Sequence, residues 1–225
     1  MTLKVTSAPR DYRLLALVAL VVLMASVVTL RSEANIFLSR PADDKAFSDA
    51  ARAGALDIPI SSYAKSALLR DCLSSMKSLY AKLQPQAYRQ AHFNACRTAA
   101  LKIAAQNPSQ SSAWFVAAFA SAALADESAY HSQFEQAFDT AMHEDWQAKR
   151  RILLALDYPD FVTQDMQGMV DSDVFTILNN NSGGAWLAQL YRTHSNMKQT
   201  IADQAEKSAD KYKKLFLDAL KRQAS

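Results

Sequence analysis

The feature that most constrains this chain is an uninterrupted apolar run near its N-terminus. Residues 14–30 (LLALVALVVLMASVVTL) contain no charged side chain. At 1.5 Å per helical residue the run covers roughly 26 Å, at the short end of what spans a bilayer. A buried core helix fits less well, because the run is apolar on every side rather than along one stripe. We therefore predict one transmembrane helix, Leu14 to Leu30.

A cleaved signal peptide is the alternative to an anchor. The triplet Ser32-Glu33-Ala34 resembles a small-x-small cleavage site. The apolar run is longer than the core of most signal peptides, and Arg31 and Glu33 lie inside the region that would be cleaved. These features favour an uncleaved signal-anchor.

The charges that flank the run predict its orientation. Lys4, Arg10 and Arg13 precede it, with only Asp11 against them. The positive-inside rule then keeps residues 1–13 in the cytoplasm and exports the remainder. For a bacterial protein this is a single-pass protein of the inner (cytoplasmic) membrane with a periplasmic domain. The same layout would suit a lumenal protein of the eukaryotic endoplasmic reticulum.

Beyond the run, the pattern predicts an all-α domain. Only 4 Gly and 6 Pro occur in 225 residues, and so few helix breakers favour helices. Apolar side chains recur at spacings of three and four, which places them on one face of each helix. Successive segments with short connections predict antiparallel helix pairs in an α-solenoid-like domain or an irregular bundle. The predicted parts after the span are a juxtamembrane linker (31–42), a helical-repeat-like domain (43–196) and a basic amphipathic C-terminal helix (197–225).

The distribution of charge argues against nucleic acid as a partner. The net charge of the chain is +3, and residues 198–222 carry seven basic and four acidic side chains. Residues 35–197 are therefore near neutral, which is not the electrostatic footprint of a nucleic-acid binder. The C-terminal helix is expected to cap the domain, with docking on a partner or on anionic lipid as alternatives.

The two cysteines of the chain, Cys72 and Cys96, are a candidate disulfide. They lie 12 residues on either side of Gln84, where Gln84-Pro85 is predicted to turn a helical hairpin. Antiparallel helices would bring both thiols to the same height, and an exported compartment permits their oxidation. The alternative is two buried free thiols that act as small core residues.

Recognisable catalytic and cofactor motifs are missing from the sequence. It has no Gly-rich phosphate loop, no G-x-S-x-G elbow, no HExxH and no Cys/His cluster. We therefore expect no catalytic residue, no metal site, no cofactor and no small-molecule ligand, and a protein that is not an enzyme. Paired carboxylates that lie far apart in the chain would escape such a search.

Aromatic and arginine side chains are the candidates for partner binding. Aromatic residues near predicted helix starts either fill the space between helix pairs or line a concave groove for a peptide or glycan. Two arginines beside one of them would supply polar contacts to such a groove or lie on a solvated face. The candidate set is Trp114, Trp146, Arg150, Arg151, Trp186 and Tyr191.

Residues 107–142 resemble one degenerate tetratricopeptide repeat. Trp114 takes the first aromatic position, Ala118 the small-residue position, and Phe134 and Ala137 two positions of the second helix. The segment departs from the family pattern in having Tyr where Ala is usual, Ser where an aromatic residue is usual and Met where Pro is usual (Tyr130, Ser121 and Met142).

The overall layout resembles small anchored helical proteins of the Gram-negative envelope, some of them associated with envelope polysaccharide systems. The resemblance implies a protein-binding scaffold and carries over no catalytic residue. We expect a membrane-anchored, non-enzymatic adaptor that binds another envelope or inner-membrane protein. A glycan-binding or glycan-acting periplasmic enzyme and an accessory subunit of a larger membrane complex are the alternatives.

Overall fold

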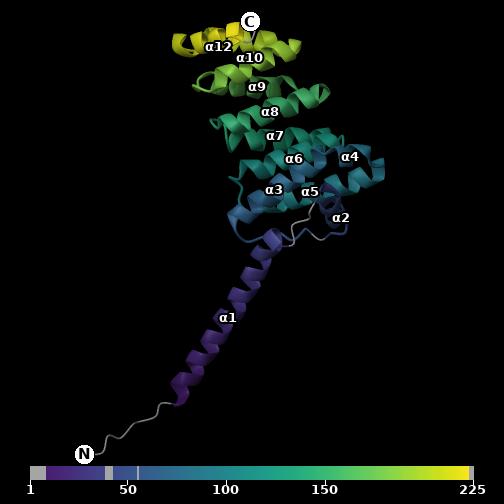
Figure 1. Ribbon diagram of the computed structural model, residues 1–225, viewed down its shortest axis with the longest axis vertical. Coiled ribbons are helices and arrows are strands. Elements are labelled where there is room, and N and C mark those ends of the chain that lie inside the picture. Colours follow the sequence, from purple (N-terminus) through teal and green to yellow (C-terminus); the bar gives the residue numbers. More distant parts are fainter. Residues whose placement is uncertain (1–8, 39–42, 55, 223–225) are drawn as a thin grey trace, which may run out of the picture.

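The computed structural model describes residues 9–38, 43–54 and 56–222, and every regular element in these ranges is a helix. Helix α1 projects from one end of a layered stack of shorter helices, and the C-terminus lies at the opposite end (Figure 1). The all-α prediction is confirmed for the described residues. The tetratricopeptide-like arrangement stays a prediction.

Helix α1 (Pro9–Leu38) contains the apolar run and extends beyond it at both ends. The window Leu14–Arg31 has a mean hydropathy of 2.5, and none of it is buried against the rest of the protein. The two hydroxyl groups of this window donate to backbone carbonyls of the same helix. Ser26 Oγ donates to the Val22 carbonyl at 2.8 Å, and Thr29 Oγ1 donates to the Ala25 carbonyl at 2.9 Å. By length and composition α1 suits a membrane span, and a signal sequence would share both properties.

Residues 31–38 of the predicted linker 31–42 are helical, because α1 continues to Leu38. No Gly or Pro interrupts the chain between the apolar run and Pro41, so the helix has no local reason to stop earlier. Residues 39–42, the rest of the predicted linker, lie outside the described residues.

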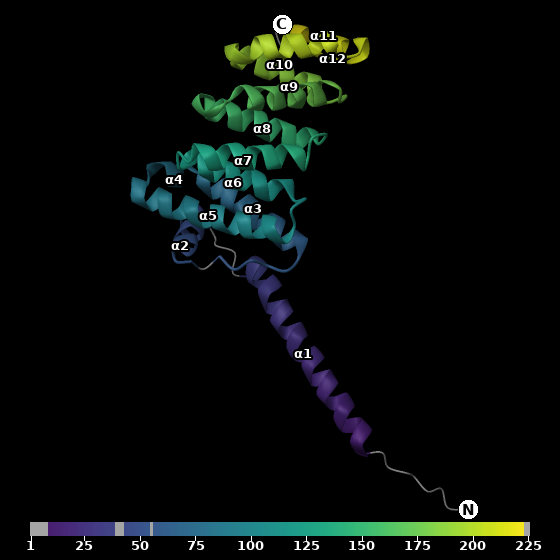
Figure 2. The ribbon, with the colours of Figure 1, turned by 180° about the vertical axis from the view of Figure 1, so that it is seen from behind.

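The helical stack, α2 to α12, rises from α1 in nearly the order of the chain, and Figure 2 shows the same order from behind. Neighbours along the chain pack together, as α5 with α6 and α8 with α9, and helices two apart also touch, as α6 with α8 and α7 with α9. The elements are α2 (Asp44–Arg52), α3 (Ser62–Lys77), α4 (Leu79–Leu83), α5 (Gln86–Gln106), α6 (Ser111–Ala123), α7 (Glu127–Asp139), α8 (Asp145–Asp157), η1 (Pro159–Phe161), α9 (Gln164–Leu178), α10 (Gly183–Thr193), η2 (Ser195–Met197), α11 (Lys198–Lys207) and α12 (Asp210–Arg222).

Helix α6 is the centre of the half of the stack that lies nearer α1. It packs against α3, α5, α7 and α8 and is buried on nearly every side. Its small residues Ala113, Ala117, Ala118 and Ala120 have no exposed surface, so neighbouring helices approach its backbone closely. This position explains why α6 is apolar all round without being a membrane span.

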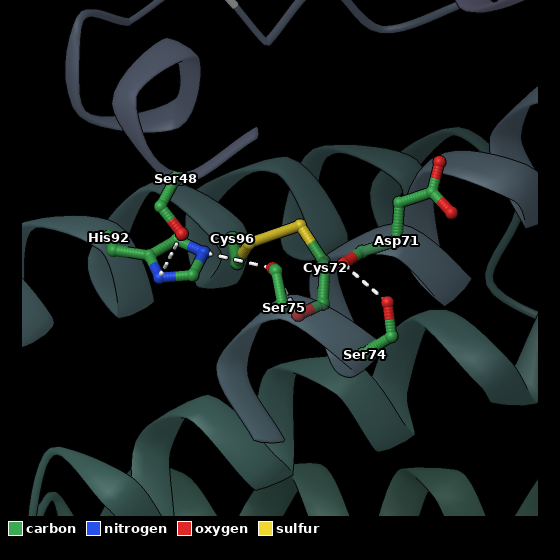
Figure 3. Close-up of a disulfide and its surroundings, with 7 residues drawn as sticks. All are labelled: Ser48, Asp71, Cys72, Ser74, Ser75, His92 and Cys96. Atoms are coloured by element: carbon green, nitrogen blue, oxygen red, sulfur yellow. Dashed lines mark hydrogen bonds between the residues drawn. A yellow bond between two sulfur atoms is a disulfide. The ribbon is translucent and has the colours of Figure 1, made fainter. Parts of the chain in front are cut away.

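A disulfide joins Cys72 of α3 to Cys96 of α5, with 5.6 Å between the two Cα atoms. His92 lies beside it and bridges two helices (Figure 3). Its Nε2 is 3.0 Å from Ser75 Oγ on α3, and its Nδ1 is 3.4 Å from Ser48 Oγ on α2. The covalent bond and the buried imidazole together fix the α2, α3 and α5 end of the stack.

The predicted single C-terminal helix over 197–225 is wrong, because the chain breaks at Ser208. Ser208 has an extended backbone (φ −79°, ψ 156°) and separates α11 from α12. The break lets α12 fold back onto α10, where the backbone of Phe216 passes directly over Gly184. Phe216 and Ala219 are buried in the folded-back arrangement, and this removal of apolar surface from water favours the break. Residues 223–225 lie outside the described residues.

Candidate partner-binding groove

A groove of about 730 Å³ lies where the tip of the α3–α4–α5 hairpin meets the ends of α6 and α8. The hairpin tip points sideways from the stack in both views (Figures 1 and 2). The volume is in the range of sites that bind small molecules or a short peptide segment. The lining residues are Met76, Lys77, Lys82, Gln86, Arg89, Gln90, Phe93, Phe119, Ala123, Leu124, Ala125, Asp157 and Tyr158; we call this set the groove.

Local sequence forms the hairpin tip by interrupting the helix twice. Ser78 ends α3 with an extended backbone and caps α4, since its Oγ accepts from the Ala81 amide at 3.1 Å. Pro85 then precedes the first residue of α5, a position where its missing N–H costs nothing. The short α4 between these two breaks carries Lys82 into the groove.

The opposite wall begins where α6 ends. Ala125 follows α6 in the left-handed region (φ 58°), and the Asp126 amide donates back to the Ser121 carbonyl at 2.9 Å, which terminates the helix. Phe119 of α6 meets the edge of the Tyr158 ring, with 6.3 Å between centroids. The two rings join the end of α6 to the end of α8 and form an apolar floor.

Burial raises the pKa of the Tyr158 phenol, and the adjacent Asp157 carboxylate raises it further. The phenol is therefore neutral at physiological pH and offers one hydrogen-bond donor and an acceptor at the groove edge.

The groove has an excess of positive charge. Lys77 and Lys82 are exposed and Arg89 is half-buried, against the single carboxylate of Asp157. Lys77 Nζ lies 5.1 Å from the centroid of the Phe119 ring, so a cation and an aromatic ring form one surface. Within the described ranges none of these three cations takes part in an ion pair. Their charge is therefore available to a ligand.

Sequence reasoning missed the groove, although the charge pattern carries a signal for it. Residues 72–125 contain no acidic side chain, and their five basic ones include all three groove cations (Lys77, Lys82, Arg89, Arg97 and Lys102). The next segment, 126–197, contains eleven acidic and four basic side chains. The net charge of residues 35–197 is near neutral because the basic segment 72–125 and the acidic segment 126–197 largely cancel.

The six predicted partner-binding residues do not form one surface. The structure brings together Trp146 and Arg150, one helical turn apart on α8, with the guanidinium carbon 4.9 Å from the indole centroid. Trp146 is 48 % exposed, and burial lowers the pKa of the half-buried Arg150 without removing its charge at neutral pH. This stacked pair is separate from the groove lining.

The prediction that Arg151 contacts a partner is wrong, because its side chain has no exposed surface. The helical rotation of about 100° between neighbours turns it inward while Arg150 stays near the surface. Inside, its guanidinium pairs with the carboxylate of Asp173 on α9. Arg151 is a structural residue of the stack.

The remaining three predicted residues are half-buried and take part in packing. The Trp114 indole N–H donates to the Pro108 carbonyl at 2.8 Å. Lys149 Nζ lies 6.0 Å from the Trp186 ring centroid, and Tyr191 meets the edge of the Phe216 ring. The contacts of Trp186 and Tyr191 lie between helices, and that of Trp114 lies with the turn before α6; a partner-binding role for the three stays a prediction.

Among the residues that the structure describes, no three His, Cys, Asp or Glu side chains gather as a metal site would require. Comparison with protein-family models, with curated proteins and with solved structures gives no match for the chain.

Proposed function

We propose that this protein is a membrane-anchored, non-enzymatic adaptor whose helical stack binds another protein of the cell envelope. The observation that carries the proposal is the groove, an amphipathic recess on a domain joined to an apolar helix, whose three cations form no ion pair with any residue that the structure describes. Its lining combines cations, side-chain amides and apolar groups with one carboxylate and one phenol, a mixture suited to hold a polypeptide.

The exposed apolar surface of α1 supports the membrane part of the proposal. Nothing in the described part of the chain buries Leu14–Arg31, and a bilayer is the apolar phase that would remove this surface from water. The basic residues before it, Lys4, Arg10 and Arg13, favour an N-terminus in the cytoplasm and a stack in the periplasm. In this arrangement α1 is retained as an anchor rather than cleaved as a signal.

A second candidate function is glycan binding, and the exposed Trp146 favours it. A flat indole beside a guanidinium offers a stacking face and charged hydrogen-bond donors, which together suit an acidic sugar. The adaptor proposal and the glycan proposal therefore use different surfaces, so variants separate them.

The test is cross-linking in cells, purification of the full chain from membranes in mild detergent, and mass spectrometry of what accompanies it. We expect one dominant, stoichiometric protein, and recovery of the full-length chain in the membrane fraction after alkaline extraction. Recovery of the chain alone, with lipid, would contradict the adaptor proposal. A soluble chain that lacks α1 would contradict the anchor.

Trp146→Ala/Arg150→Ala, assayed for protein capture and for glycan binding separately, distinguishes the two candidates. Loss of glycan binding with intact protein capture would favour the second function at this pair. Phe175→Ala/Lys102→Ala is the matched control, because it removes one exposed aromatic ring and one exposed cation from other helices.

A further inference from the structure

We propose that the groove binds an acidic segment of the partner polypeptide, one that also inserts an apolar side chain against Phe93 and Phe119. This inference rests on the adaptor function and specifies its partner by chemistry. Three observations support it: the positive charge of the groove, the amide and apolar groups that line it beside that charge, and the position of the groove in the stack.

Charge complementarity selects a ligand with carboxylates. Lys77, Lys82 and Arg89 come from three successive helices, α3, α4 and α5, and among the described lining residues only Asp157 carries an opposing charge. Unpaired cations attract an acidic segment over several ångströms and repel a basic one, which increases the rate of association and its specificity.

The remaining lining selects a polypeptide over a lone anion. Gln86 and Gln90 lie one turn apart on α5, and each side-chain amide donates and accepts hydrogen bonds, as peptide groups require. Met76, Phe93 and Phe119 are buried apolar residues whose remaining surface also lines the groove. A free phosphate or carboxylate could accept from the amide N–H groups but would leave the amide oxygens and this apolar surface without a partner.

A second copy of this chain fits the groove poorly as the occupant, although its 126–197 segment is acidic. In the stack, residues 72–125 lie nearer α1 than residues 126–197 do (Figure 1). Two copies anchored in one membrane with the same orientation would place basic layer beside basic layer. Their like charges would oppose side-by-side association.

The test is photo-cross-linking from the groove in the full-length, membrane-anchored chain. The photoreactive amino acid p-benzoylphenylalanine replaces Gln90, or, as a control, the exposed Gln189 of α10. After irradiation of intact cells, mass spectrometry identifies the molecule and the segment joined to it. We expect position 90, and not position 189, to capture a polypeptide segment rich in Asp and Glu.

Charge-reversal variants test whether the cations hold this segment. Lys82→Glu/Arg89→Glu should reduce the cross-link from position 90 by at least about tenfold. Lys102→Glu/Lys214→Glu, which removes equal charge from exposed positions outside the groove, should leave it unchanged. Lys substitutions at the partner's acidic positions should restore the cross-link to the groove variant, which also shows that the variant is folded.

Each other outcome overturns the proposal. These are a cross-link from position 90 to lipid, to a glycan, to a second copy or to a segment without excess carboxylates, and a cross-link yield that Lys82→Glu/Arg89→Glu leaves unchanged. If membrane purification still returns a stoichiometric partner in those cases, the groove inference fails and the adaptor function stands. If neither experiment returns a protein, the adaptor function fails as well.

Discussion

Arg151 and Asp173 form a completely buried ion pair that joins α8 to α9. Arg151 Nε donates to Asp173 Oδ2 at 2.8 Å and Nη2 donates to Oδ1 at 2.6 Å, a bidentate geometry. The same guanidinium donates to the carbonyls of Ala137 and Ala141, at 2.9 and 3.1 Å. One side chain therefore provides hydrogen-bond donors for two backbone carbonyls at the end of α7, and it holds α7, α8 and α9 in register.

Removal of one member of this pair should destabilise the stack strongly. Asp173→Ala leaves a guanidinium buried without its counter-charge, and we expect the free energy of unfolding to fall by about 3–5 kcal/mol. Arg151→Met/Asp173→Leu should lower the free energy of unfolding by less than Asp173→Ala does, because the double variant leaves no unpaired charge in the interior. Chemical denaturation of the full chain in detergent micelles measures these values. Arg150→Met is the control, with a change of about 1 kcal/mol or less; equal losses from Asp173→Ala and Arg150→Met would contradict the prediction.

The disulfide should contribute to stability by closing the α3–α5 hairpin. Cys72 and Cys96 are 24 residues apart in sequence, and a bond that closes such a loop stabilises a fold by about 3 kcal/mol. Dithiothreitol should lower the free energy of unfolding of the parent chain by this amount. Cys72→Ala/Cys96→Ala should be insensitive to the reductant. Two free thiols in protein isolated without reductant, detected by mass spectrometry, would show that the bond does not form in cells.

Buried His92 should make the fold sensitive to acid. Burial lowers the pKa of His92 to about 4, although the Asp44 carboxylate opposes this effect. In the unfolded chain a histidine has a pKa of about 6.5, so between these values the unfolded state binds the extra proton. Protonation of this residue in the unfolded state should therefore lower the free energy of unfolding by about 3 kcal/mol as the pH drops from 7 to 4.

The comparison of histidine variants isolates this contribution from that of other titrating groups. His92→Gln, which cannot be protonated in this range, should show a flatter loss of stability over pH 7 to 4 than the parent. His143→Gln, at an exposed histidine, should follow the parent curve. Parallel curves for the parent and His92→Gln would refute the prediction.

Two glycines at the start of α10 leave little room for a side chain, Gly183 less than Gly184. A Cβ on Gly183 would lie 1.8 Å from the Ile177 carbonyl oxygen, and one on Gly184 would lie 3.1 Å from the Phe216 amide nitrogen. We expect Gly184→Ala to lower the free energy of unfolding by about 1–3 kcal/mol and to increase amide hydrogen exchange across α12. Gly183→Ala should lower the free energy of unfolding by more. Gly168→Ala is the control, because its Cβ meets nothing within 4 Å and should be neutral or stabilising by up to about 1 kcal/mol.

The sequence alone determined the features that depend on local pattern. An apolar run of 17 residues makes α1, and the scarcity of Gly and Pro makes the remainder helical, because backbone propensity and periodicity act within one element. The register of Cys72 and Cys96 could also be predicted, since the Gln84-Pro85 turn sets two antiparallel helices at equal heights.

Which side chains are exposed at the surface depends on the tertiary structure. Arg150 and Arg151 are adjacent and chemically identical, but one stacks on an exposed tryptophan and the other is buried against Asp173, 22 residues away. The groove likewise combines residues from α3, α4, α5, α6 and α8. Helical periodicity gives the rotation of each residue about its own axis, whereas the exposure of a face depends on which other helices pack there.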